Sequence, residues 1–239
     1  MKSLYIIKAG STFASRVERL GDFEDWIISG LDHLPCPIRV VDAVRGGQLP
    51  QHDECAGAVV TGSHAMVTDD LFWSLAIESW IRGIVESSVP FLGICYGHQL
   101  LGRATGGRVG YHPLGKEVGT VAVELTADGT SDALFDGVPE RFPAHATHAQ
   151  SVLQLPPGAI RLAGNAHEPN HAFRVGRCAW GVQFHPEYTP VVMDAYVMAQ
   201  KTELASAGRD VDALISGIAE TPGAGMVLKN FASLACRAI

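Results

Sequence analysis

The amino-acid sequence predicts an α/β fold in which helices flank a mostly parallel sheet. In roughly the first hundred residues, short β-rich runs alternate with segments of helical spacing, which is typical of strands connected by helices. From about residue 108 the chain consists mainly of short strands and turns, and after His185 the spacing of apolar residues becomes helical again. These changes indicate antiparallel strands appended to the parallel sheet, followed by a helical C-terminal extension.

Four strands and three helical segments are expected in the first part. Gly21 and Gly30 interrupt the first helical segment, and paired glycines end the last one. Since each strand is followed by a helical crossover, the strands should run parallel and be covered on both faces. The expected strands are 4–10, 38–44, 56–62 and 90–95, and the helical segments are 15–34, 71–87 and 97–107.

The second part contains the sequences expected for the appended strands, and then the extension. The strand candidates are "VAVEL", "SVLQL", "AIRLAG", "HAFRV" and "CAWGVQF", and the later helices are expected at 190–208, 211–220 and 225–239. No linker, repeat or low-complexity tract is visible. We therefore expect one domain over 1–239, with a flavodoxin-like core at about 4–190 and the helical extension at about 190–239.

Composition excludes several classes of function. With 18 Lys and Arg against 25 Asp and Glu, the net charge is -7, which argues against a nucleic-acid partner. No apolar stretch approaches the length of a membrane span, and the N-terminal apolar run is too short for a signal peptide. The five cysteines lack C-x-x-C spacing, and the closely spaced histidines lie in strand or loop composition. We expect a cytoplasmic protein with no metal, no cofactor and no membrane partner.

Cys95 is the first candidate for chemistry. It ends the strand expected at 90–95, and Gly93 and Gly97 flank it in a G-x-C-x-G pattern. Glycines on both sides allow a sharp strand-to-helix turn, which lifts the central side chain clear of the sheet. The unpaired N–H groups at the start of the following helix favour a thiolate. Alternatively, Cys95 is a buried core residue, as cysteines often are.

"WGVQFHPEY" (180–188) supplies a base and a group to orient it. His185 ends an apolar strand, and Pro186 keeps the next residues extended. Side chains two apart in an extended segment point the same way, so Glu187 should reach the imidazole nitrogen that does not face Cys95. A turn with a solvated histidine is the alternative. Cys95, His185 and Glu187 together predict nucleophilic catalysis by a thiol.

"FLGICYGHQLLGRATGG" and "GVQFHPE" closely resemble the class I, triad-type glutamine amidotransferase family, over about residues 4–190. The resemblance implies that Cys95 attacks the glutamine carboxamide and forms a γ-glutamyl thioester. It implies that His185 transfers protons and that Glu187 orients His185. "RLGDFEDWI" (19–27) and the helical extension resemble free-standing, GMP-synthase-like members. Asp22, Glu24 and Asp25 could instead form a solvated helix face, which is the commoner meaning of such charges.

The resemblance also implies an oxyanion hole and a substrate pocket. The backbone N–H of Tyr96 should be one oxyanion donor, and the other should come from Gly62 or Ser63. The family usually has a glycine pair and then proline there, so this loop, with His64, is altered. An ordinary turn is the alternative. For substrate binding the resemblance indicates Gln99 and the segment around 146–152, where Thr147 and Gln150 replace the usual Ser and Asp. The implied pocket residues are Gln99, Thr147, His148, Ala149 and Gln150.

Three functional interpretations follow, because the sequence shows no P-loop and no synthase domain. The chain could hydrolyse glutamine and deliver ammonia to a separate synthase. It could instead be a self-sufficient hydrolase of γ-glutamyl peptides, conjugates or amines. A third interpretation, which the intact triad argues against, is an inactive regulatory binding module.

An apolar stripe in the last helix could pack on its own domain or form a partner surface; its residues are Val227, Leu228, Phe231 and Leu234.

Overall fold

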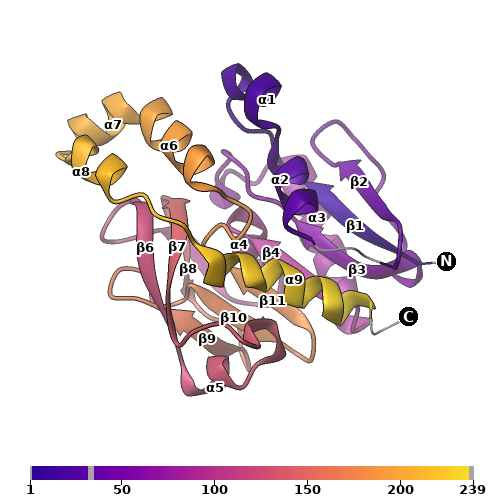
Figure 1. Ribbon diagram of the computed structural model, residues 1–239. Helices are drawn as coiled ribbons and strands as arrows, with labels where there is room; N and C mark the ends of the chain where they lie inside the picture. Colours follow the sequence, from indigo (N-terminus) through magenta and orange to yellow (C-terminus); the bar gives the residue numbers. More distant parts are fainter. Residues whose placement is uncertain (1, 32–34, 237–239) are drawn as a thin grey trace.

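The computed structural model describes residues 2–31 and 35–236, and a nine-stranded mixed sheet forms its centre (Figure 1). The strand order is β2-β1-β3-β4-β11-β10-β9-β6-β7. The parallel half of the sheet consists of β1 (Ser3–Lys8), β2 (Ile38–Asp42), β3 (Cys55–Val60), β4 (Phe91–Ile94) and β11 (Ala179–Val182). The predicted α/β class, with a mostly parallel sheet flanked by helices, is confirmed.

Helices cover both faces of the parallel half, because its strands carry apolar side chains in alternation toward each face. One hydrophobic cluster joins Leu4 and Leu92 to α2 (Phe23–Gly30) and α9 (Pro222–Cys236). The other joins Ile7 and Phe91 to α3 (Phe72–Glu86) and α4 (Tyr96–Ala104). In α9, Val227, Leu228 and Phe231 are fully buried, so most of the apolar stripe packs on the sheet of its own chain.

The antiparallel half extends the sheet beyond β11. It contains β6 (Glu117–Leu125), β7 (Arg141–His148), β9 (Ile160–Gly164) and β10 (Ala172–Val175), and the short α5 (Ala127–Thr130) follows β6. β5 (Arg108–Tyr111) and β8 (Gln150–Gln154) form a separate two-stranded sheet. The sequence placed "CAWGVQF" among the antiparallel strands; β11 in fact runs parallel to β4 and antiparallel to β10, so it joins the two halves.

Two helical segments expected from the sequence are divided, the first of them at Gly21, one of the two glycines seen to interrupt its spacing. The segment 15–34 becomes α1 (Ala14–Leu20) and α2, because Gly21 takes a left-handed φ of 79° and Asp22 caps α2; positions 32–34 lie outside the described residues. In Figure 1, α6 (Pro190–Ala199), α7 (Lys201–Ser206) and α8 (Val211–Ser216) form a helical wall beside β6 and β7. The predicted helix 190–208 is therefore broken at Gln200. Positions 237–239 of the last predicted helix also lie outside the described residues.

None of the helices described is long and apolar enough to cross a membrane.

Asp22 and Glu24 are not merely a solvated helix face. Asp22 caps α2 through the N–H of Phe23, and its other oxygen lies 2.7 Å from Lys8 Nζ. Glu24 accepts from the same ammonium at 2.6 Å. Burial disfavours the charged carboxylate, but Lys8 and the backbone N–H groups outweigh it and lower the pKa of Asp22. These charges fix α2 against the end of β1.

Candidate active site

Adjacent parallel strands bring the two main candidate residues together. Cys95 directly follows β4 and His185 lies just beyond β11, and these strands pair with Val182 opposite Ile94. The loop after β3 emerges at the same edge of the sheet. The carboxyl edge of a parallel sheet is where open α/β proteins usually place their ligands.

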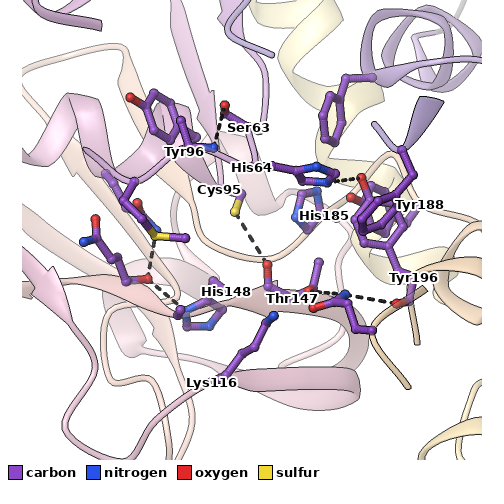
Figure 2. Close-up of a pocket in the computed structure, with 18 of the residues that line it drawn as sticks. Ser63, His64, Cys95, Tyr96, Lys116, Thr147, His148, His185, Tyr188 and Tyr196 are labelled. Carbon is purple, nitrogen blue, oxygen red and sulfur yellow. Dashed lines mark hydrogen bonds between the residues drawn. The ribbon is translucent and has the colours of Figure 1, made fainter. Parts of the chain in front are cut away.

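Cys95 occupies a strained turn between β4 and α4. Its φ of 50° and ψ of -94° lie outside the regions that side-chain-bearing residues normally adopt. The turn is tightly packed, because a Cβ at Gly97 would overlap the carbonyl oxygen of Val60. Cys95 is 6% exposed, and its Sγ lies 4.0 Å from the carbonyl oxygen of Thr147 across the cavity (Figure 2). The turn thus presents the thiol to the cavity at the start of a helix.

His185 is held on several sides. Its Nδ1 lies 2.7 Å from Glu187 Oε1, and its backbone N–H donates to the carbonyl of His145 at 2.8 Å. The ring of Tyr188 stacks on the imidazole with centroids 4.0 Å apart. His185 Nε2 is buried and has no hydrogen-bond partner among the described residues, which leaves it available to a ligand.

The electrostatic surroundings favour the protonated form of His185. Burial by itself lowers the pKa of this imidazole, but Glu187, and then the sulfur of Cys95, outweigh it and raise the pKa to about 10. Glu187 is itself nearly inaccessible, so its negative charge acts on His185 with little screening by water. The arrangement suits an imidazolium beside a thiolate.

A cavity of about 440 Å³ opens between these residues and the helical wall. Gly62 and Glu187 do not line the cavity. Gly62 lies beside the His185 imidazole, where a Cβ would come within 3.1 Å of His185 Cε1. Glu187 contacts the Nδ1 side of the same imidazole. All other residues singled out from the sequence line the cavity, namely Ser63, Cys95, Tyr96, Gln99, Thr147, His148, Ala149, Gln150 and His185.

The side chains of Gln99 and Gln150 fasten the cavity wall. Gln99 Nε2 donates to the carbonyl of Gln150 at 2.8 Å and to Gln183 Oε1 at 3.1 Å. Gln150 Oε1 accepts from the N–H of Val67 at 3.0 Å, and its Nε2 donates to Thr68 Oγ1 at 2.6 Å. Gln150 therefore ties β8 to the loop at 67–68 and does not present its amide to the cavity.

His148 belongs to a buried polar network. Its Nδ1 lies 3.0 Å from the carbonyl of Gln150, and its Nε2 lies 3.0 Å from Glu117 Oε2. Glu117 also contacts His171 Nε2 at 3.1 Å. Although burial opposes ionisation, the two histidines outweigh it and hold the pKa of Glu117 well below its usual range. The network fixes the peptide segment 147–150 in the cavity wall.

Several lining residues were not found from the sequence. The aromatic rings of Phe23 and Tyr188 stack near His185. The hydroxyl of Tyr196 lies 2.8 Å from Thr12 Oγ1 and 3.1 Å from His64 Nε2. The helical wall adds two polar side chains, and Lys116 reaches in from the start of β6. Helical spacing predicted a helix at 190–208 but did not indicate what it would pack against. The lining residues not assigned to the site from the sequence are Phe13, Phe23, His64, Ala65, Met66, Tyr111, Lys116, Tyr188, Tyr196, Gln200 and Glu203.

No group of three or more His, Cys, Asp or Glu side chains in the described part of the chain is placed to hold a metal ion. His112 and His167 stack with centroids 4.4 Å apart, and His148 contacts Glu117, so these histidines pack together without forming a ligand set. The cavity contains a thiol, an imidazole with a raised pKa and many uncharged hydrogen-bonding groups. Such a set suits covalent catalysis at a carbonyl carbon.

The fold and the site define an α/β protein with a cysteine at the strand-to-helix turn and a carboxylate-oriented histidine beside it. The family model for class I glutamine amidotransferases matches residues 20–204, so the chain belongs to that family. The resemblance drawn from the two sequence motifs is thereby confirmed.

Individual relatives agree with this assignment. The chain is 33% identical over 174 residues to a GMP synthase of Aeropyrum pernix, which covers 73% of this chain and 30% of that protein. It is 28% identical over 198 residues to gamma-glutamyl peptidase 5 of Arabidopsis thaliana, with 80% and 74% covered. A glutamine amidotransferase structure from Thermotoga maritima superposes with a TM-score of 0.78 at 22% identity, covering 99% of both chains. The match covers less than a third of the length of the GMP synthases of Aeropyrum pernix, Thermomicrobium roseum and Porphyromonas gingivalis.

Proposed function

We propose that this protein hydrolyses the side-chain amide of glutamine through a γ-glutamyl thioester on Cys95, and that the ammonia is used by a separate synthase. The observation that carries the proposal is the position of Cys95, at a strained turn facing an imidazole whose other nitrogen is held by Glu187. The thiol is the nucleophile, His185 carries protons, and Glu187 orients His185.

In the first half-reaction the Cys95 thiolate forms a bond to the amide carbon, and the carbonyl oxygen becomes an oxyanion. The N–H of Tyr96 lies at the first position of α4, where no intrahelical acceptor exists, and it is one donor for this oxyanion. The other donor comes from the backbone of Gly62 or Ser63. When the C–N bond breaks, His185 Nε2–H gives its proton to the leaving nitrogen, and ammonia departs.

In the second half-reaction the now neutral His185 accepts a proton from water, and the hydroxide adds to the thioester carbon. The same backbone donors hold the second oxyanion. Collapse of this intermediate expels the Cys95 thiolate and releases the product as a carboxylic acid, which gives its proton to ammonia or the solvent to form glutamate, with His185 again protonated. The proton count closes after each turnover, and no metal or cofactor takes part in these steps.

The test is the detection of the thioester. Purified protein is mixed rapidly with L-glutamine, quenched in acid and examined by mass spectrometry for a γ-glutamyl adduct on Cys95, and glutamate is measured in parallel. We expect Cys95→Ala to abolish both signals, and His185→Ala to abolish turnover, with unchanged circular dichroism in each case. Glutamate formation that persists in Cys95→Ala would show that another group carries the reaction.

The use of a separate synthase is supported by the relatives. One of them, from Archaeoglobus fulgidus, is 39% identical over 103 residues, and its name describes a single subunit of a glutamine-hydrolysing GMP synthase. A chain that depends on such a partner would hydrolyse glutamine slowly alone and faster in the complex. Co-purification from the source cells, followed by glutaminase assays with and without the captured protein, tests this part.

A second candidate function is the hydrolysis of γ-glutamyl peptides, conjugates or amines without any partner. The observation that favours it is the helical wall, because α6 and α7 enclose the cavity with Tyr196, Gln200 and Glu203. The similarity to gamma-glutamyl peptidase 5 supports it as well. Rapid release of glutamate from a γ-glutamyl dipeptide, with slow release from glutamine, would establish this second function. The third interpretation, an inactive regulatory module, would require that neither glutamine nor a γ-glutamyl compound forms a thioester on Cys95.

A further inference from the structure

Two oppositely charged side chains face each other at the mouth of the cavity. Lys116 directly precedes β6 and Glu203 lies on α7, and Nζ is 3.0 Å from Oε1. The Lys116 side chain is 26% exposed and that of Glu203 is 63% exposed, and both line the cavity. The backbone carbonyl of Lys116 also accepts from Arg209 at 3.0 Å, which fastens this point to the turn after α7.

Outside the proposed catalytic groups, this pair is the main source of charge in the cavity. Apart from the histidines, every other lining residue among those described is apolar, aromatic, sulfur-containing or a neutral amide or hydroxyl. A free α-amino acid group carries one positive and one negative charge. It loses water on entering a cavity, so each of its charges needs an opposite partner there.

The position of Lys116 relative to Cys95 suits such a head group. Glu117, the next residue, pairs with His148 across β6 and β7, so Lys116 begins beside the wall formed by 147–150. In Figure 2 the Lys116 side chain extends from the lower edge of the cavity toward Thr147, whose carbonyl oxygen lies 4.0 Å from Cys95 Sγ. Only three carbon–carbon bonds separate the reacting carbonyl carbon of a γ-glutamyl group from its α-carbon. The head therefore lies close to the reacting carbon, inside the cavity that Lys116 lines.

The wall itself offers no negative charge to an ammonium group. Gln150 is neutral, and its amide is engaged by Val67 and Thr68. The carboxylate of Glu117 is buried behind the wall and contacts His148 and His171. Glu203, supplied by the helical wall, is the carboxylate that an ammonium group at the mouth can reach.

We propose that Lys116 and Glu203 recognise the charged head of the γ-glutamyl substrate, Lys116 binding its α-carboxylate and Glu203 its α-ammonium group. The inference rests on the function proposed above and assigns two residues that determine specificity. The ion pair between them separates on binding, and each side chain exchanges its partner for one end of the zwitterion. Such an exchange costs little, because a partly exposed ion pair contributes little stability.

The test measures binding without chemistry. Lys116→Met and Glu203→Gln are each made in the Cys95→Ala protein, and L-glutamine is titrated by calorimetry together with two analogues, glutaramic acid, which lacks the α-amino group, and 4-aminobutanamide, which lacks the α-carboxylate. We expect each variant to weaken L-glutamine binding by about tenfold or more. Lys116→Met should have no further effect on 4-aminobutanamide, and Glu203→Gln should have no further effect on glutaramic acid.

The Arg141–Glu124 pair provides a matched control, because it is exposed, 3.5 Å apart and outside the cavity. Glu124→Gln and Arg141→Met should leave L-glutamine affinity unchanged. Three results would overturn the assignment: L-glutamine affinity unchanged in both cavity variants, a variant that weakens the binding of both analogues equally, or no L-glutamine binding by the Cys95→Ala parent. Failure of the chemistry would appear separately, as the absence of a thioester in the protein that retains Cys95.

Discussion

The two walls of the cavity are built in different ways. One wall is the carboxyl edge of the parallel sheet, where Cys95 and His185 are buried and their backbones are fixed by neighbouring strands. The other is α6 and α7, whose side chains reach the cavity from short helices joined at Gln200. The first wall holds the groups proposed to react, and the second holds groups proposed to recognise the substrate.

The packing of the two walls differs in the same way. The sheet wall belongs to the two large hydrophobic clusters that run through the sheet. The helical wall has a smaller cluster of its own, in which Val192 and Val197 pack with Phe23, Trp26 and Val118. Because most of the helical wall's own apolar residues lie in this smaller cluster, which meets the sheet at Val118, substitutions there should disturb the main sheet clusters less than substitutions in the sheet wall.

Among changes that leave both reacting groups, Cys95 and His185, in place, the largest effect on activity is expected from Glu187→Gln in the sheet wall. An amide preserves the shape but removes the charge that orients and stabilises the His185 imidazolium. We expect kcat to fall on the order of 10³-fold, less than in Cys95→Ala, because the orienting residue does not itself react. Steady-state glutamate release by the two variants makes the comparison; equal losses would assign Glu187 a more direct part.

The pH dependence of the same variant follows from His185. With Glu187 present the pKa of the imidazole is about 10, so the protonated form that serves the leaving nitrogen is lost only as pH rises through about 10. In Glu187→Gln the raising influence of the carboxylate is gone while burial still lowers the pKa. The decline in kcat at high pH should therefore move to lower pH, and a decline at an unchanged pH would contradict the role of the carboxylate.

The turn at Cys95 should be intolerant of any added atom. In Gly97→Ala the new methyl group would overlap the carbonyl of Val60, and neither backbone can move without disturbing β3 or α4. We expect a loss of about 3 kcal/mol in the free energy of unfolding, measured by urea denaturation. Gly225→Ala is the matched control: nothing lies within 4 Å of its added Cβ, and alanine in the interior of α9 should stabilise by about 0.5–1 kcal/mol.

The sequence was informative about the sheet wall because its determinants are local. Glycines two residues from Cys95, and the extended His185–Pro186–Glu187 run, follow from the backbone geometry that each turn requires. The direction of β11 was not predictable in this way, since a short apolar run fits either a parallel or an antiparallel partner.

The helical wall depends on contacts between residues far apart in the chain. Lys116 and Glu203 are separated by 87 positions, and Thr12 and Tyr196 by 184. Helical spacing predicted a helix at 190–208, but it contains no information about which loop that helix will meet. The cavity residues missed from the sequence are of this kind.

The smallest effect is expected from Tyr196→Phe in the helical wall. The change removes one hydroxyl that bonds to Thr12 Oγ1 and to His64 Nε2, while the ring and its contacts with Phe13 and Tyr188 remain. We expect a loss of about 1 kcal/mol in stability and a change of only a few-fold in kcat/KM, measured with glutamine and a γ-glutamyl dipeptide. Tyr111→Phe makes the same chemical change at an exposed cavity residue and should alter neither quantity. A loss in kcat as large as that of Glu187→Gln would mean that the helical wall takes part in the reaction, and the division between the two walls would fail.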